Sequence, residues 1–141
     1  MLRVAINGFG RIGRTTLKAG WGKKGFNVVA VNDLTDAETL AHLLKYDSVY
    51  RTWDHEVKAK KDKLIIDGRE IQVFAQKDPK ALPWKQMKID VVLECTGFFT
   101  SEEGAGGHLT AGAKSVIISA PAKGGNVPTY MMGVNAGQLK G

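Results

Sequence analysis

Three glycines near the start of the chain have the spacing of a phosphate-binding turn. Gly8, Gly10 and Gly13 form the pattern G-x-G-x-x-G directly after an apolar run at residues 4–6. Between a strand and a helix, the first glycine permits a tight turn, the second lets a pyrophosphate approach the backbone, and the third lets the helix pack closely. The pyrophosphate would sit on unpaired N–H groups at the positive end of the helix dipole. The pattern therefore predicts a dinucleotide-binding site.

The glycine pattern also requires an acidic residue about 20 positions further on, at the end of the next strand, to bind the ribose hydroxyls. Asp33 stands at this distance from Gly13 and follows an apolar run at residues 28–31. A carboxylate there repels a 2′-phosphate, and Leu34 offers that phosphate no donor. The alternative, that Asp33 is only a turn residue, is less favoured because of the glycine spacing. We therefore predict a site for NAD rather than NADP.

The elements that would position these residues follow from hydrophobic periodicity. A helix is predicted over about residues 10–20, with Ile12 and Leu17 facing inward. The near-continuous apolar run at residues 26–32 is typical of a parallel strand buried on both faces. Together they predict a strand, a glycine turn, a helix and a second strand at the start of the chain.

A capping box formed by Thr35 and Glu38 predicts a second helix through about residue 44. Residues 46–54 read as a loop. Hydrophobicity then alternates with a period of two around the turn signal at residues 67–68, which predicts a small antiparallel hairpin. A group of lysines surrounds the first turn of this hairpin: Lys58, Lys60, Lys61 and Lys63. We interpret them as a solvated hairpin face rather than a nucleic-acid-binding patch.

The second half of the chain continues the alternation of strands and helices. Asp78 before Pro79 predicts the start of a short helix, and a capping box led by Thr100 predicts a helix through about residue 111. That helix contains several glycines, each of which costs roughly 1 kcal/mol relative to alanine. Strands are predicted at residues 89–94, 115–119 and 130–134.

This alternation implies right-handed crossovers and an open parallel sheet. We therefore predict one α/β domain over residues 1–141: a Rossmann-type, doubly wound, mostly parallel sheet with a small antiparallel hairpin insertion. In the strand order 3-2-1-4-5-6, the ends of strands 1 and 4 flank the crevice that holds a dinucleotide. That order would bring the glycine turn together with Asp33, Thr96, Gly97 and Ser119.

Composition and charge exclude several classes of protein. The 141 residues are 43% hydrophobic, and no apolar run reaches the roughly 18–20 residues of a membrane helix. No signal peptide is apparent, and one cysteine excludes an intrachain disulfide. The net charge of +6 permits weak association with polyanions, but no helix carries a dense basic face. We expect a cytoplasmic protein with no membrane partner and no specific nucleic-acid partner.

Cys95 and the histidines have ordinary interpretations. Cys95 with His108 as its base would be a candidate nucleophilic pair, but a buried thiol at a strand end is favoured, since nothing indicates an electropositive setting. His42, His55 and His108 have neither a cysteine cluster nor the carboxylate spacing of a metal site. We predict no catalytic residue and no metal site within this sequence.

Over essentially its whole length the sequence resembles glyceraldehyde-3-phosphate dehydrogenase, and the matching segments occur in the family's order. These segments are V-A-I-N-G-F-G-R-I-G-R at 4–14, V-N-D-L-T-D at 31–36, H-L-L-K-Y-D-S at 42–48, E-C-T-G-F-F-T at 94–100, H-L-T-A-G-A-K at 108–114 and V-I-I-S-A-P-A-K at 116–123. The sequence departs from the family pattern at the glycines of 104–107, at Arg51-Thr52-Trp53 and at Gly20-Trp21-Gly22.

The resemblance implies roles for individual residues in holding NAD. The backbone amides of Arg11 and Ile12 would face the pyrophosphate, and Asp33 would accept hydrogen bonds from the adenosine ribose. The other expected neighbours of the cofactor are Lys77 beside the adenine, Thr96 and Gly97 on the adenosine side, Ser119 at the nicotinamide end, and Asn7 and Phe9 at the wall of the pocket.

The family oxidises an aldehyde by hydride transfer to NAD, coupled to acyl phosphate formation in glycolysis. Its nucleophilic cysteine lies in a Ser-x-x-Cys-Thr-Thr-Asn segment, which these residues do not contain. The resemblance therefore implies an NAD-binding portion, without the catalytic domain, that binds NAD and does not catalyse. Glyceraldehyde-3-phosphate, phosphate and assembly as a homotetramer would belong to the full-length enzyme.

Two alternatives have different consequences. Within the enzyme class, erythrose-4-phosphate dehydrogenase is the nearest, although the segment at residues 119–123 favours the glyceraldehyde-3-phosphate enzyme. Outside it, a basic nucleotide- or nucleic-acid-binding module would need no redox chemistry at all.

Overall fold

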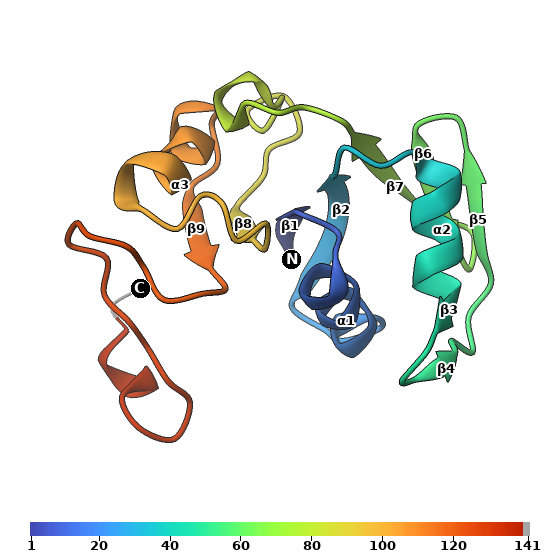
Figure 1. The fold of residues 1–141 in the computed structure, drawn as a ribbon, viewed down its shortest axis with the longest axis horizontal. Coiled ribbons are helices and arrows are strands. Elements are labelled where there is room, and N and C mark those ends of the chain that lie inside the picture. Colours follow the sequence, from blue (N-terminus) through green and yellow to red (C-terminus); the bar gives the residue numbers. More distant parts are fainter. Residues whose placement is uncertain (140–141) are drawn as a thin grey trace.

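The computed structural model describes residues 1–139, which form one seven-stranded sheet with helices on both faces (Figure 1). The strands of this sheet are β1 (Leu2–Asn7), β2 (Phe26–Asn32), β5 (Val57–Lys60), β6 (Lys63–Ile66), β7 (Arg69–Phe74), β8 (Val91–Glu94) and β9 (Ser115–Ile118). The helices are α1 (Arg11–Gly20), α2 (Ala37–Lys45) and α3 (Glu102–Thr110), with short 3-10 turns η1 (Pro79–Ala81) and η2 (Ala136–Gln138).

The sheet has the predicted doubly wound topology. Its order is β5-β6-β7-β2-β1-β8-β9, and the pairs β7–β2, β2–β1, β1–β8 and β8–β9 are all parallel. Counted along the chain, β7 is the third parallel strand, so the order 3-2-1-4-5 is confirmed. The carboxyl ends of β1 and β8 therefore lie side by side, as a dinucleotide crevice requires.

The antiparallel insertion is built into the main sheet. β5 pairs with β6 and β6 with β7, both antiparallel, before β7 turns to pair with β2. The β6–β7 turn is the predicted one, and Asp67 and Gly68 both have positive φ there, at 48° and 80°. Residues 46–54, expected to be a loop, contain a two-stranded antiparallel ribbon, β3 (Tyr46–Asp47) with β4 (Arg51–Thr52).

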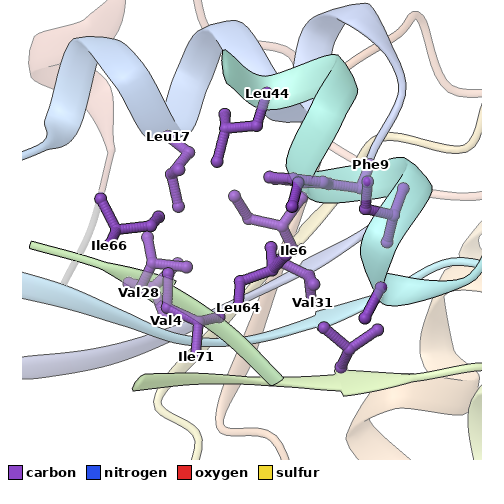
Figure 2. Close-up of a cluster of buried hydrophobic side chains, with 14 residues drawn as sticks. Val4, Ile6, Phe9, Leu17, Val28, Val31, Leu44, Leu64, Ile66 and Ile71 are labelled. Carbon is purple, nitrogen blue, oxygen red and sulfur yellow. The ribbon is translucent and has the colours of Figure 1, made fainter. Parts of the chain in front are cut away.

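One face of the sheet carries an entirely apolar core, which we call the first core. It forms because β1 alternates: Val4 and Ile6 point to this face and Ala5 to the other. Figure 2 shows the side chains of this core between the strands and helices α1 and α2. Its buried members are Val4, Ile6, Phe9, Leu17, Val28, Val31, Ala37, Leu40, Ala41, Leu44, Leu64, Ile66, Ile71 and Val73.

The opposite face carries a smaller second core. Its buried apolar members are Ala5, Ala30, Leu82, Trp84, Ile89, Val92 and Ala113. Helix α3 lies on this side, with the ring of His108 6.3 Å from that of Trp84. The glycine-rich sequence of α3 does form a helix, which packs against η1 and β9.

Two helix starts differ from the predicted ones by one residue. The N-cap of α2 is Asp36, not Thr35, because the Asp36 carboxylate accepts from the Thr39 amide at 2.9 Å. The Thr35 amide is already held by Asp33, which leaves the helix to begin after it. In the same way, Ser101 caps α3 in place of Thr100, its hydroxyl accepting from the Gly104 amide at 3.0 Å.

The prediction that Ile12 faces inward was wrong. The buried positions of α1 are Gly13 and Leu17, one turn apart on the face toward β1, as the helical period requires. Gly13 sits so close to the preceding turn that a Cβ there would lie 2.3 Å from the Gly8 carbonyl oxygen. Ile12 is therefore rotated out of this face and is 54% exposed.

The predicted strand at residues 130–134 does not form. The side-chain oxygen of Asn135 accepts from the Met131 amide at 2.7 Å, and the Met131 carbonyl accepts from the amides of Val134 and Asn135. These bonds close the segment into a turn. In Figure 1 the chain after β9, orange to red, extends away from the sheet instead of adding a strand.

Two of the departures from the family pattern meet in space. Trp21, at the end of α1, packs edge-on against Trp53 with ring centroids 6.0 Å apart. The Trp21 indole N–H donates to Asp67 in the β6–β7 turn, and His55 contacts the same carboxylate at 2.6 Å.

Within residues 1–139 no helix has both the length and the apolar composition needed to cross a membrane.

Candidate functional site

The glycine turn, residues 8–13, lies between the end of β1 and the start of α1. Gly8 has φ +87°, and a Cβ on it would lie 2.7 Å from the Thr96 amide nitrogen. Only glycine satisfies both demands, because other residues avoid positive φ and carry a Cβ. At Gly10 the requirement is different: a Cβ there would meet no protein atom within 4 Å. Gly8 and Gly13 are therefore required by the fold, while the backbone at Gly10 faces open space.

The start of α1 is suited to an anion. Gly10 is the N-cap and provides no side-chain hydrogen bond, and the first turn contains no acidic residue. The first amides of an α-helix have no partner within the helix, and the dipole makes that end positive. The side chain of Arg11 is held to one side, its guanidinium 3.2 Å from the Asp47 carboxylate.

Asp47 is itself strongly organised. The backbone amides of Tyr50 and Val49 hold the pKa of the Asp47 carboxyl down to about 2, with a smaller contribution from Arg11. The carboxylate is therefore ionised at neutral pH and keeps the Arg11 side chain directed toward β3. The Arg11 backbone remains at the helix start.

Asp33 joins the glycine turn to the end of β2. One carboxylate oxygen accepts from the Phe9 amide at 2.8 Å, and the other from the Thr35 amide at 3.0 Å. Each oxygen keeps further acceptor capacity. Two backbone amides thus fix the carboxylate beside the turn in an orientation that can accept ribose hydroxyls.

The other residues predicted for the site also lie at the carboxyl ends of parallel strands. Thr96 and Gly97 follow β8, and Thr96 packs against Gly8. Ser119 follows β9 and is exposed, with its amide bound to the Glu94 carbonyl. Lys77 is exposed beyond β7. The structure therefore gathers Asn7, Phe9, the glycine turn, Asp33 and Thr96 closely, and sets Lys77 and Ser119 at neighbouring strand ends.

Cys95 is half-buried behind this group. Burial raises the pKa of its thiol, and the neighbouring Glu94 charge raises it further, while a hydrogen bond from Ser119 acts the other way. A thiol in that setting is a poor nucleophile, because the thiolate is the reactive form. The interpretation as a buried thiol is therefore supported.

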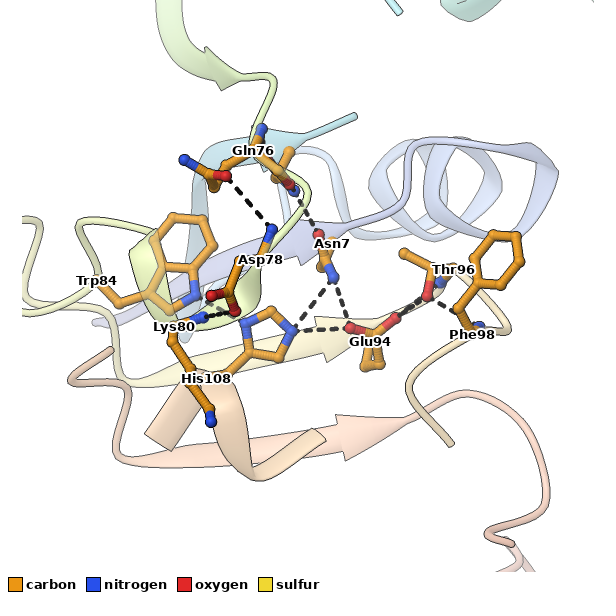
Figure 3. Close-up of polar contacts among 10 residues, drawn as sticks. Asn7, Gln76, Asp78, Lys80, Trp84, Glu94, Thr96, Phe98 and His108 are labelled. Atoms are coloured by element: carbon orange, nitrogen blue, oxygen red, sulfur yellow. Dashed lines mark hydrogen bonds and ion pairs between the residues drawn. The ribbon is translucent and has the colours of Figure 1, made fainter. Parts of the chain in front are cut away.

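A buried polar network, to which the sequence analysis assigned no role, lies beneath the site (Figure 3). Glu94 is 1% exposed and His108 is fully buried, and the two are 2.8 Å apart between Oε2 and Nε2. The Asn7 side-chain amide donates to the same carboxylate oxygen at 2.6 Å, and the Trp84 indole N–H donates to His108 Nδ1 at 2.9 Å.

A signal for this network was present in the sequence. Asn7, Asn32 and Glu94 are polar residues that each end a buried apolar strand. Because buried polar side chains need hydrogen-bond partners, three of them on adjacent strands predict contact with one another. His108 carries no such signal, since it becomes buried only when α3 packs on the sheet.

Burial by itself would raise the pKa of the Glu94 carboxyl. Hydrogen bonds from His108, Thr96 and Asn7 outweigh that effect, so its pKa lies below the ordinary value. Glu94 is therefore an ionised carboxylate in the interior.

Among residues 1–139, no group of three or more His, Cys, Asp or Glu side chains is placed to hold a metal ion.

Comparison with known proteins agrees with this geometry. Residues 2–102 match the family model described as the NAD-binding domain of glyceraldehyde 3-phosphate dehydrogenase. The chain is 52% identical over 141 residues to glyceraldehyde-3-phosphate dehydrogenase of Clostridium pasteurianum, covering 100% of this chain and 42% of that protein. It is 54% identical to the enzyme of Thermotoga maritima, covering 99% of this chain and 42% of that protein.

A third relative is the glyceraldehyde-3-phosphate dehydrogenase of Mycoplasma pneumoniae. It is 55% identical to this chain over 134 residues, covering 95% of this chain and 40% of that protein. The chain thus spans about two-fifths of the length of the curated relatives that it matches. With the glycine turn, the fixed Asp33 and the family match in agreement, the chain belongs to the glyceraldehyde-3-phosphate dehydrogenase family as its NAD-binding domain, and its cofactor is NAD.

Proposed function

We propose that this chain is the cofactor half of a phosphorylating glyceraldehyde-3-phosphate dehydrogenase, and that it binds NAD at the carboxyl ends of β1, β2 and β8. One observation carries the proposal: the uncapped start of α1 lies beside a carboxylate, Asp33, that the Phe9 amide holds at 2.8 Å. An anion site and a ribose acceptor at this spacing match the two halves of an adenosine diphosphate.

Individual residues take the following parts in the proposal. The Arg11 and Ile12 amides bind the pyrophosphate, and Asp33 accepts from the adenosine ribose. Phe9 and Asn7 are buried at 1% and 2% exposure, which suits walls behind the cofactor better than direct polar contacts. Lys77, Thr96, Gly97 and Ser119 complete the rim at neighbouring strand ends.

Bound NAD supplies the hydride acceptor for aldehyde oxidation. The residues of this chain bind and orient it, because holding the reactants in a fixed relation removes much of the entropic cost of reaction. The nucleophile and base of the family are not among these residues, and Cys95 has a raised pKa. We therefore propose that the 141-residue chain alone binds NAD without turnover. The whole enzyme would act on glyceraldehyde-3-phosphate and phosphate in the cytoplasm as a homotetramer.

The alternatives are not favoured. A nucleic-acid module would need unpaired cations, but two of the hairpin lysines are engaged: Lys63 pairs with Glu70 and Lys58 with Glu56, each at 2.6 Å. Such exposed pairs contribute little stability, yet they dilute the positive surface. The family match likewise favours the glyceraldehyde-3-phosphate enzyme over a related dehydrogenase.

The proposal is tested by titrating the purified chain with NAD and NADP in a calorimeter. We expect NAD to bind more tightly than NADP, and Asp33→Asn to weaken NAD by roughly tenfold or more, as the loss of a charged hydrogen-bond acceptor predicts. The same change should narrow the preference for NAD, because it removes the charge that repels a 2′-phosphate. Asp54→Asn, an exposed change of equal charge, is the control. Equal or tighter binding of NADP by the unaltered chain would overturn the assignment of Asp33.

Inactivity is tested by incubating the chain with glyceraldehyde-3-phosphate, NAD and phosphate and following absorbance of the reduced cofactor. We expect no turnover. Turnover that disappears in Cys95→Ser would show that this chain holds its own nucleophile, contrary to the proposal.

A further inference from the structure

The buried network beneath the cofactor site includes a charge that the site does not expose. Glu94 is 1% exposed and His108 is fully buried, so neither can contact a bound dinucleotide directly. Burying an ionised carboxylate is costly unless it is fully hydrogen-bonded. The role of the Glu94 charge can therefore be inferred from the groups that donate hydrogen bonds to it.

The protonation of His108 follows from its partners. The Trp84 indole N–H can only donate, so His108 Nδ1, 2.9 Å away, must accept. Nδ1 is then unprotonated, and the ring is neutral with its proton on Nε2. That proton points to Glu94 Oε2 at 2.8 Å. Trp84 thus fixes the histidine tautomer as a donor to the carboxylate (Figure 3).

The second oxygen of Glu94 organises the turn after β8. Glu94 Oε1 accepts from the Thr96 amide at 2.9 Å and from the Thr96 hydroxyl. That hydroxyl oxygen accepts in turn from the Phe98 amide at 3.1 Å. Gly97, between them, has φ +75°. The shape of residues 96–98 is therefore built around one carboxylate oxygen.

The network also reaches the first two strands of the fold. Asn7 donates to Glu94 Oε2 at 2.6 Å, and its own carbonyl oxygen accepts from the Asn32 side chain at 2.7 Å. Asn32 exchanges two hydrogen bonds with the backbone of Gln76, beyond β7. One continuous chain of bonds thus ties the carboxyl ends of β7, β2, β1 and β8 together.

We propose that Glu94 is a positioning residue for NAD: held by His108 and Asn7 on one oxygen, it sets the Thr96–Gly97 turn against Gly8 with the other. The proposal rests on NAD binding at this site, as proposed above. The contact it controls is tight, since a Cβ on Gly8 would lie 2.7 Å from the Thr96 nitrogen and 2.9 Å from the Cys95 carbonyl carbon. A small shift of the Thr96–Gly97 turn would therefore displace the backbone of the glycine turn at Gly8.

Glu94→Gln separates charge from shape. A glutamine has one accepting oxygen and one N–H₂ group, so one side of the network must place a donor against donors. His108 cannot relieve the conflict by moving its proton, because Trp84 already occupies Nδ1. The conflict falls either on Thr96 or on the pair formed by Asn7 and His108, and in both cases the network no longer holds one arrangement.

The experiment combines calorimetric NAD titration with amide hydrogen exchange of the cofactor-free protein. For Glu94→Gln we expect the Kd for NAD to rise by roughly tenfold and the Thr96 and Phe98 amides to exchange faster. Ile71→Val, which alters only the first core, serves as the control for general destabilisation and should change neither. In the unaltered protein, the nitrogen shifts of His108 should report a proton on Nε2 and none on Nδ1.

An unchanged Kd and unchanged exchange at Thr96 in folded Glu94→Gln would overturn the proposal. If Glu94→Gln does not fold, Glu94→Asp keeps the charge but shortens its reach, and it should weaken NAD in the same way; NAD binding equal to the unaltered chain would again contradict us. Failure of the unaltered chain to bind NAD would defeat the proposed function and with it the role of Glu94 toward NAD, whereas hydrogen exchange at Thr96 and Phe98 would separately decide whether Glu94 holds the turn.

Discussion

The two faces of the sheet are built on different principles. The first core, under α1 and α2, consists of apolar side chains alone. The second face places Trp84 and an α3 histidine beside a buried carboxylate. Apolar packing is tolerant of which atoms meet, whereas a hydrogen-bonded network fixes direction and donor order. The difference suggests that the first face supplies stability, while the second face supplies the geometry of the site.

The largest effect should come from the first core. Leu64, on β6, is completely buried, so Leu64→Ala should lower the free energy of unfolding by about 2–5 kcal/mol through lost contact and a residual cavity. Leu43, 37% exposed on α2, is the matched leucine, and its replacement should cost much less. Urea unfolding followed by circular dichroism measures both. Similar losses for the two leucines would contradict a stability-bearing first core.

A smaller effect, confined to acid, should come from the second face. The pKa of Glu94 in the folded protein lies below its ordinary value of 4.5, so the ionised carboxylate contributes stability that is fully present above the unfolded-chain value. That contribution is lost as the pH falls through the folded-state pKa. As the pH is lowered from 7, the free energy of unfolding should therefore fall less steeply for Glu94→Gln than for the unaltered chain.

The comparison between these two proteins isolates Glu94. The pKa values of Asp36, Asp67 and Asp90 are also lowered, each chiefly by a hydrogen bond to its carboxylate, and they contribute equally to both curves. Parallel pH profiles for the two proteins would show that the Glu94 charge does not contribute to folding.

The smallest effect should be a gain within α3. Gly106 lies inside this helix, and a Cβ there would meet no atom within 4 Å. Gly106→Ala should therefore stabilise the protein by about 0.5–1 kcal/mol, because glycine is a poor helix former. Gly107→Ala is the contrast, since its Cβ would lie 3.2 Å from the Pro79 side chain. Thermal unfolding of the two variants measures how tightly the second face is packed around Gly107. Equal shifts of the unfolding midpoint in the two variants would contradict the contact between Gly107 and Pro79.

The sequence predicted what depends on local pattern. The strand–turn–helix start, the position of Asp33 and the parallel order of the strands follow from spacing and period, and the structure agrees. The predicted N-caps, Thr35 and Thr100, were each one residue too early, because the adjacent residues Asp36 and Ser101 have similar capping ability and take the position. The strand expected at residues 130–134 is replaced by a turn, because the Met131 amide donates to the Asn135 side chain and the Met131 carbonyl accepts from the amides of Val134 and Asn135.

The part that His108 plays in the buried network could not be predicted from the sequence, for a different reason. His108 is separated from Glu94 by 14 positions and from Asn7 by 101, and only the packing of α3 brings them together. A histidine in a weak, glycine-rich helix gives no periodic signal for such burial. Long-range polar contacts of this kind need the fold itself before they can be inferred.

Whether the glycine turn holds the pyrophosphate of NAD can be decided at Gly10. A Cβ at Gly10 meets no neighbouring protein atom within 4 Å, and its φ of −75° suits alanine, so Gly10→Ala should fold with only the small loss of thermal stability that alanine causes at an N-cap. The added methyl group would occupy the space through which a phosphate approaches, and calorimetric titration should show a large loss of NAD affinity. Gly106→Ala, with equally open surroundings, should bind NAD like the unaltered chain. Full NAD affinity in folded Gly10→Ala would show that the glycine turn does not hold the pyrophosphate.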